Sequence, residues 1–241
     1  CKMKRILITA VALSLSLHTS AQEVATQLAF GSANYLDTYL SPEKYRGFEG
    51  RFISEVLRYS GKRPLAYALT HEGAISTTHN RAGNANELCG SYDFTYSMMY
   101  RTAFCGGRLR LLAGGMAGYS IGFAYNMRNS ANNPAQGYTS LGIGPHLMLR
   151  YDLTLWGRTF PVNWEARMPF VGVMFSPNYG QSYYEIFNRG DYDHNIVVTT
   201  LAVPQLRHHL SIDIPLSTRY ALRIGYLGDY RQAKPNNLKQ H

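Results

Sequence analysis

Apolar and polar residues alternate along much of this chain with a period of two. Residues 90–104 show the pattern most clearly, because the even positions are large and apolar while most odd positions are polar, with Met99 as the exception. Successive side chains of a β-strand point to opposite faces. This segment is therefore predicted to be one long strand with an apolar face and a polar face.

The same alternation recurs in eight further segments. The clear ones are residues 109–126, 138–153, 160–175, 205–214 and 219–231, and the weaker ones are residues 27–40, 46–59 and 65–78. The sequence thus predicts nine strands.

Short and long connections alternate between these strands. The short ones carry the Gly, Pro and Ser of tight turns, at residues 61–64, 106–107, 156–158 and 215–218. Longer polar loops fall near residues 79–87, 129–137 and 176–195. Outer-membrane barrels show this asymmetry, with short periplasmic turns and longer outside loops.

The amount of apolar surface favours a barrel in lipid. A small barrel has little more than side-chain volume inside, and strands that each offer five or six Tyr, Phe and Met would overfill it. Beyond the N-terminal segment there is also no run of 18 apolar residues for a spanning helix. We expect an all-β fold, an antiparallel transmembrane β-barrel of about ten strands. The alternative is a soluble β-barrel that binds a lipophilic ligand, with its apolar face turned inward.

The N-terminal segment has the features of a secretory signal peptide. Lys2, Lys4 and Arg5 precede an apolar run from Ile6 to Leu17, and Ala21 offers a small residue at the cleavage position. We expect residues 1–21 to be a signal peptide and residues 22–241 to form the barrel domain. The expected location is the outer membrane of a Gram-negative bacterium, with outer-membrane lipid, periplasmic chaperones and the barrel-assembly machinery as partners.

The charge balance adds little to this prediction. Without its first 21 residues the chain has 24 − 3 = 21 basic residues against 15 acidic ones, a net charge of about +6. The basic residues are spread singly and form no run, so nucleic acid is not an expected partner. The charged fraction of 16% lies below the roughly 25% of typical soluble domains.

The polar faces of the predicted strands carry charges of both signs. These residues are expected to point into the lumen: Glu49, Arg51, Glu55, Glu72, Asp93, Arg101, Arg110, Arg150, Glu165, Arg167, Arg207, Asp213 and Arg223. Arginine suits such a place because its guanidinium pairs carboxylates bidentately. Two interpretations stay open, an ion-pair network that fills a narrow barrel and a narrow charged pore.

Catalytic chemistry has one weak candidate, Asp191, Asp193 and His194 in the longest loop. An acid and a histidine that activate water resemble omptin-type proteases, and a barrel-embedded hydrolase with a site at the outer rim is the alternative function. No Ser stands in a nucleophile context. No metal site or cofactor is expected, because His71 and His79 would lie about 26 Å apart on one strand.

The organisation from Gln22 to Lys234 resembles the small outer-membrane barrels of Bacteroides-type bacteria, in particular a family known as a domain of unknown function. The resemblance rests on the segment that begins Tyr45-Arg46-Gly47-Phe48 and on the closing residues 236–239. It implies a fold and a location and no activity. Such barrels have an even strand count, so a closing strand is predicted to be missing from this chain, as in a truncated copy of a ten-stranded barrel.

Overall fold

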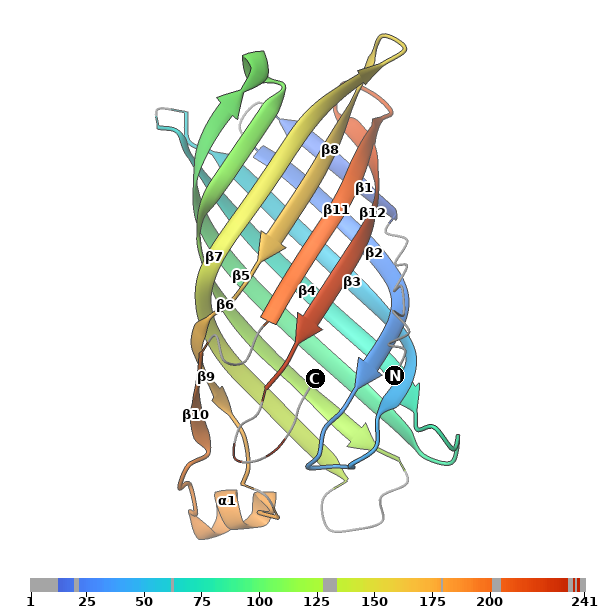
Figure 1. Ribbon diagram of the computed structural model, residues 1–241, viewed down its shortest axis with the longest axis vertical. Coiled ribbons are helices and arrows are strands. Elements are labelled where there is room, and N and C mark those ends of the chain that lie inside the picture. Colours follow the sequence, from blue (N-terminus) through green and yellow to red (C-terminus); the bar gives the residue numbers. More distant parts are fainter. Residues whose placement is uncertain are drawn as a thin grey trace, which may run out of the picture.

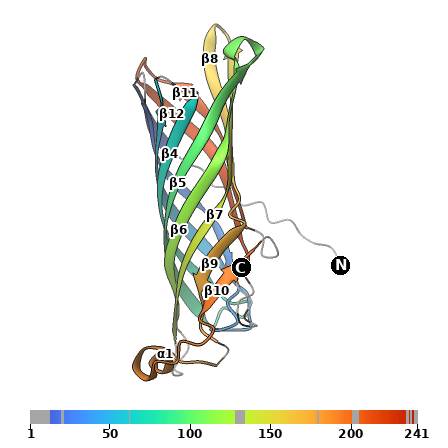
Figure 2. The same ribbon diagram turned by 90° about the vertical axis from the view of Figure 1, so that its left-hand side faces the viewer.

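A computed structural model describes residues 13–19, 22–61, 63–127, 134–178, 180–200, 205–233, 236 and 238. The chain folds into an antiparallel β-barrel that is taller than it is wide (Figures 1 and 2). The strands are β1 (Leu13–Thr19), β2 (Gln22–Tyr35), β3 (Tyr45–Tyr59), β4 (Leu65–His79), β5 (Asn86–Phe104), β6 (Leu109–Asn126), β7 (Ala135–Leu155), β8 (Arg158–Arg167), β9 (Val171–Phe175), β10 (Ile196–Thr199), β11 (Gln205–Pro215) and β12 (Tyr220–Arg231). One short helix, α1 (Tyr183–Arg189), lies in the loop between β9 and β10, and no helix of the described residues could cross a membrane.

The wall of the barrel is a ring of ten strand positions, which we call places. Neighbours from β2 to β7 follow the chain order, β8 pairs with both β7 and β11, and β12 pairs with β11. Strands β9 and β10 continue the places of β8 and β11, because β9 pairs with the other end of β7 and β10 pairs with β9. The nine predicted strands are therefore confirmed as neighbours in one barrel.

The tenth place lies between β12 and β2, where the sequence predicted a missing closing strand. Strand β1 occupies it and pairs with both neighbours, Leu15 facing Thr26 on one side and Leu222 on the other. These are residues that the sequence analysis assigned to a signal peptide. Most of that peptide, residues 1–12, 20 and 21, lies outside the described residues.

Two strand predictions were wrong in their bounds. The strand expected at 27–40 is β2, which ends at Tyr35 because the chain turns at Asp37, whose carbonyl accepts the amides of Leu40 and Ser41. The strand expected at 160–175 is interrupted at Pro169, a residue that has no N–H to donate to a ladder. The amides of Met168 and Phe170 still bond to β7, so β8 and β9 follow one path with a distortion between them.

The connections separate by length as predicted. The hairpin turns β3–β4, β5–β6, β7–β8 and β11–β12 lie at one end of the barrel, and the long loops with α1 lie at the other (Figure 1). We call these the short-turn end and the long-loop end.

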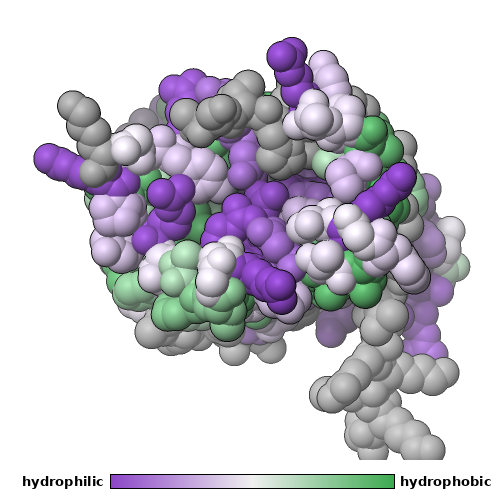
Figure 3. Space-filling model, turned by 90° about the horizontal axis from the view of Figure 1, so that it is seen from above, coloured by the Kyte–Doolittle hydropathy of each residue, from purple (hydrophilic) through white to green (hydrophobic). Residues whose placement is uncertain are grey.

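The barrel turns its apolar face outward. Large apolar side chains on the wall are 37–59% exposed, including Leu28, Phe30, Phe48, Phe52, Ile75, Tyr92, Tyr96, Met98, Tyr100, Ile121, Phe123, Leu141, Ile143, Leu206, Leu210 and Ile224. Seen from the short-turn end, hydrophilic residues occupy the centre of the ring, and hydrophobic residues appear around it (Figure 3). This orientation is opposite to the one required by the soluble ligand-binding alternative.

Candidate functional site: the interior of the barrel

Ion pairs cross the interior from one wall to the other. Four of them join strands that stand five places apart in the ring of ten, which means directly opposite each other. These pairs, with their N–O distances, are Arg167–Glu55 (3.1 Å), Arg150–Glu23 (2.7 Å), Arg207–Glu72 (2.6 Å) and Arg231–Asp93 (2.8 Å). Because strands so placed share no edge, such contacts are possible only through the lumen.

Arg167 on β8 is the centre of this network. Its guanidinium pairs with Glu55, with Glu72 at 3.6 Å and with Glu165 on its own strand, and it donates to the hydroxyl of Thr70 at 2.8 Å. Its side chain is 3% exposed. A guanidinium can serve several carboxylates at once because its five N–H donors lie in one plane.

A second group of charges lies on β3 and β12. Arg51 pairs with Glu49 (3.0 Å), Glu72 (3.3 Å) and Asp229 (2.7 Å), so it links the two groups through Glu72. Asp229 is shared in turn with Arg231 at 2.9 Å. Asp93 also accepts a hydrogen bond from Ser120.

The remaining charges lie toward the short-turn end. Arg223 binds Asp213 through two hydrogen bonds of 2.6 and 2.9 Å, and Asn163 donates to the same carboxylate at 3.0 Å. Arg110 pairs with Asp152 on the neighbouring strand.

Arg101 differs from the other residues proposed for the lumen. Its guanidinium carbon lies 5.1 Å from the centre of the Tyr59 ring, a cation–π contact. That ring is positioned by Glu23, which accepts from the Tyr59 hydroxyl at 3.2 Å.

Several members of this network were not among the residues expected to point into the lumen. Asp229 and Arg231 occupy the polar phase of β12, and Glu23 and Asp152 occupy that of β2 and β7. Their position on the polar side of the alternation was the signal in the sequence that pointed to the lumen. Which arginine meets which carboxylate depends on the register between opposite walls, and the sequence does not contain it.

Two histidines on the polar phase of their strands also lie inside, although they were not among the charged residues expected in the lumen. His146 is 1% exposed and sits between Ser97, 2.8 Å from its Nδ1, and Glu165, 3.0 Å from its Nε2. His209 is 5% exposed, and its Nε2 has no hydrogen-bond partner among the described residues.

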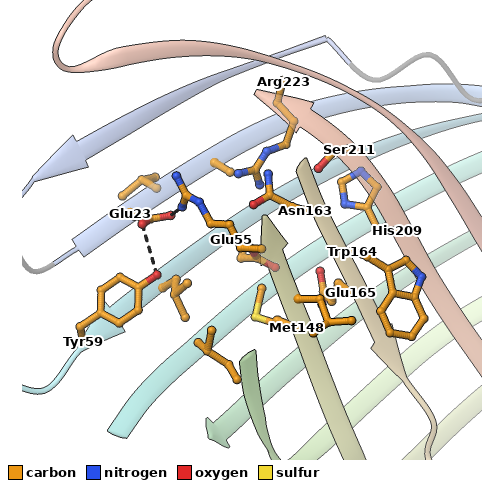
Figure 4. A pocket seen from close by; sticks show the side chains of 16 residues that line it. Glu23, Glu55, Tyr59, Met148, Asn163, Trp164, Glu165, His209, Ser211 and Arg223 are labelled. Atoms are coloured by element: carbon orange, nitrogen blue, oxygen red, sulfur yellow. Dashed lines mark hydrogen bonds and ion pairs between the residues drawn. The ribbon is translucent and has the colours of Figure 1, made fainter. Parts of the chain in front are cut away.

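A small cavity of about 40 Å³ lies beside His209. That volume holds about three water molecules. It is lined by carboxylates, including Glu55 and Glu165, and by the apolar side chains of Leu112 and Met148 (Figure 4).

Apolar side chains bound the charged layer on both sides. Toward the short-turn end lies a cluster of buried residues made of Leu57, Ala66, Ala68, Met99 and Leu112, with Tyr59 and Met148 against it, and Leu112 and Met148 also line the cavity. Toward the long-loop end Leu40, Cys89 and Ala124 form another cluster with Tyr35, Tyr39 and Tyr138. Met99, which broke the polar phase of its strand, thus has its place in the interior apolar layer.

The long-loop end is ordered by α1 and its contacts. Ser182 caps the helix in a capping box with Glu185, and the hydrogen bonds of Ser182 lower the pKa of that carboxyl. Tyr183 donates to the carbonyl of Gly137, and Tyr39 donates to the carbonyl of Gln181 at 2.9 Å. The apolar run at residues 183–187 therefore forms a helix whose Tyr183 hydrogen bonds to a neighbouring loop.

Asp37 is buried in the first long loop. Burial raises the pKa of its carboxyl to about 7, and the nearby Glu87 adds to the effect, while the amide of Tyr39 donates to it and opposes the shift. This group therefore gains a proton at a much higher pH than an exposed aspartate does.

The three catalytic candidates do not form a site. The side chains of Asp191, Asp193 and His194 are exposed, and the contacts of these residues use their backbone carbonyls, which accept from Gln181, Asn178 and Asn236. No group of three His, Cys, Asp or Glu side chains within the described ranges is placed to hold a metal ion.

These features define a class of protein, a β-barrel with an apolar exterior and an interior filled by ion pairs. The sequence matches the family described as a protein of unknown function (DUF3316) over residues 6–241, and the chain belongs to this family. The expected resemblance to a domain of unknown function is confirmed. No curated protein and no solved structure matches the sequence.

Proposed function

We propose that this chain is an integral outer-membrane β-barrel of a Gram-negative bacterium whose lumen is closed by ion pairs and whose role is structural. In this proposal residues 1–21 direct export, and periplasmic chaperones and the barrel-assembly machinery deliver the chain. The single observation that carries the closed lumen is the set of four ion pairs between opposite walls.

The exterior supports the membrane location. Outward side chains such as Phe48, Ile75 and Ile143 are more than half exposed, and a soluble protein rarely exposes an apolar surface that extends around its wall. In a lipid bilayer the same surface is buried, and the strands from β2 through β8 and β11 to β12 pair their backbone groups with those of their neighbours.

The interior supports a structural role over a pore. Arginine and carboxylate side chains meet across the lumen at hydrogen-bonding distance, and apolar clusters lie on both sides of them. The cavity beside His209 is enough for a few water molecules.

The narrow charged pore is the second candidate, because the lumen contains charges of both signs. In such a pore the cross-lumen pairs of Arg167 and Arg207 would have to separate. The hydrolase candidate has no supporting geometry, since the side chains of its three residues point into solvent.

The experiment folds the full chain in detergent, compares the mobility of boiled and unboiled samples on a gel, and then measures conductance in a planar bilayer. We expect a mobility shift and no sustained conductance. A chain that dissolves in plain buffer and shows no shift would contradict the membrane location. A shift with steady single-channel steps would replace the structural role by the pore.

A further inference from the structure

The place between β2 and β12 is only partly filled. Strand β1 covers seven of the 14 residues of β2 and four of the 12 residues of β12. Within the described residues, the remaining parts of these two edges, residues 29–35 and 224–231, pair only with β3 and β11. We call this place the seam.

The two edges of the seam present matching faces. On the outside, Leu28 and Phe30 of β2 and Ile224 and Tyr230 of β12 are exposed. On the inside, Ala25, Ala29 and Ala221 are small and buried. A strand with apolar residues at alternate positions and small residues between them would complete both faces.

A buried polar group also lies along the seam. Gln27 is 2% exposed, and its side-chain oxygen has no hydrogen-bond partner among the described residues. It stands opposite Ser14 in the register of β1.

We propose that the seam is a strand-binding site. Its ligand is an extended peptide segment, antiparallel to both β2 and β12, with apolar residues at every second position and small polar residues between them. Residues 13–19, which read Leu-Ser-Leu-Ser-Leu-His-Thr, are one such segment and not a fixed part of the wall.

The inference rests on the proposed function, in which the N-terminal segment is removed and the wall faces lipid. Without β1 the edges of β2 and β12 would leave backbone N–H and C=O groups unpaired, and in lipid each such group costs several kcal/mol. A strand that adds to both edges at once removes that cost on two sides, the principle of β-strand addition.

The first test locates residues 13–19 in the full chain. Cys1, Cys89 and Cys105 are replaced by Ser, and the pair L15C/T26C is compared with L15C/F30C, whose second cysteine lies four residues, about 13 Å, further along β2. We expect oxidation to join the first pair at least fivefold more than the second. Equal yields would overturn the proposal.

The second test asks whether the site exchanges its strand. A protease recognition sequence is inserted between Ser20 and Ala21 of the full-chain T26C variant, the protein is folded in detergent and then cut, and a labelled peptide of residues 12–20 carrying L15C is added. The control peptide has the same amino-acid composition, but the residues of its three apolar positions stand next to one another, so it lacks the alternation. Covalent capture of the first peptide and not of the second is the expected result.

The results that would contradict the inference differ from those that would contradict the proposed function. A cut barrel that unfolds, or one that keeps β1 and captures neither peptide, would show that β1 is a permanent wall strand and would overturn the inference. Equal capture of both peptides would do the same. A full chain that dissolves without detergent would contradict the proposed function. Its solubility is measured before any peptide is added.

Discussion

Arg167 shows how one side chain connects the walls of this barrel. It lies on β8, reaches Glu55 on the opposite wall, and is almost completely buried. The free energy of unfolding gains little from such a group when compared with an apolar filling. Removing one partner, however, leaves uncompensated charge in the buried interior.

We therefore expect Arg167→Met to lower the free energy of unfolding by about 3–5 kcal/mol. Glu55, Glu72 and Glu165 would each lose a partner. The measurement is urea unfolding of the folded protein in detergent, followed by tryptophan fluorescence. Arg158→Met, an exposed position beside the β7–β8 turn, should stay within about 0.5 kcal/mol. Equal stability of the two variants would contradict the central place of Arg167.

Asp37 gives a prediction that depends on pH. Its pKa is about 7 in the folded protein and about 3.9 in an unfolded chain. A raised pKa means that the folded protein holds a proton that the unfolded chain releases. The stabilising contribution is complete below about pH 4 and is lost as the pH rises through 7.

Asp37→Asn copies the protonated form and keeps an oxygen for the amide of Tyr39. At pH 8 we expect it to raise the free energy of unfolding by on the order of 2 kcal/mol, and at pH 4 to change it little. Unfolding curves at both pH values test this. Asp191→Asn, an exposed carboxyl in another loop, should show no such difference between pH values. A gain at pH 4 as large as that at pH 8 would rule out the buried carboxyl as its cause.

At the scale of elements, several glycines stand where the backbone of a neighbouring strand comes very close. A Cβ added at Gly114 of β6 would stand 2.0 Å from the carbonyl oxygen of Met98 on β5. Gly47, Gly144 and Gly172 show the same close approach to a neighbouring carbonyl. Such positions allow a sheet to curve into a narrow barrel.

Gly114→Ala is accordingly expected to destabilise the barrel by about 1–3 kcal/mol, because a carbonyl of β5 must move. Gly73→Ala on β4 meets no atom within 4 Å and should be tolerated within about 0.5 kcal/mol. The two variants can be compared by the temperature at which the folded band disappears on an unboiled gel. Equal temperatures would show that the approach at Gly114 costs nothing.

The sequence predicted most elements because a strand with two different faces repeats every second residue, and that repeat survives in a single chain. It did not predict the interruption at Pro169, although the missing N–H of proline was a readable signal. It also missed α1, whose Ser182 and Glu185 have the spacing of a capping box. The pairing of Arg167 with Glu55 could not be predicted, because it depends on how far opposite walls are staggered.

At the scale of the whole molecule, the two ends differ in a way that intact cells can report. The two cysteines within the described residues are free, Cys105 exposed at the short-turn end and Cys89 buried. If the long-loop end faces outward, a membrane-impermeant maleimide should leave Cys105 unmodified until the outer membrane is permeabilised.

The matched variant moves the reactive cysteine from the short-turn end to the long-loop end. In C105S/N188C the new cysteine stands on the exposed side of α1, and it should react in intact cells at once. Mass spectrometry of the purified protein measures both, and Cys89 should stay unmodified throughout. Rapid modification of Cys105 in intact cells would reverse the proposed orientation.

The opposite walls of this barrel are joined at contact distance by Arg167–Glu55 and by Arg207–Glu72. The diameter of a barrel grows roughly in proportion to its number of strands, so a duplicated hairpin would separate all four cross-lumen pairs together. Unlike a barrel filled with water, this one could not change its strand number by a single insertion without losing its interior charges as well. Variation between family members is therefore expected in the long loops, while the circumference stays constant.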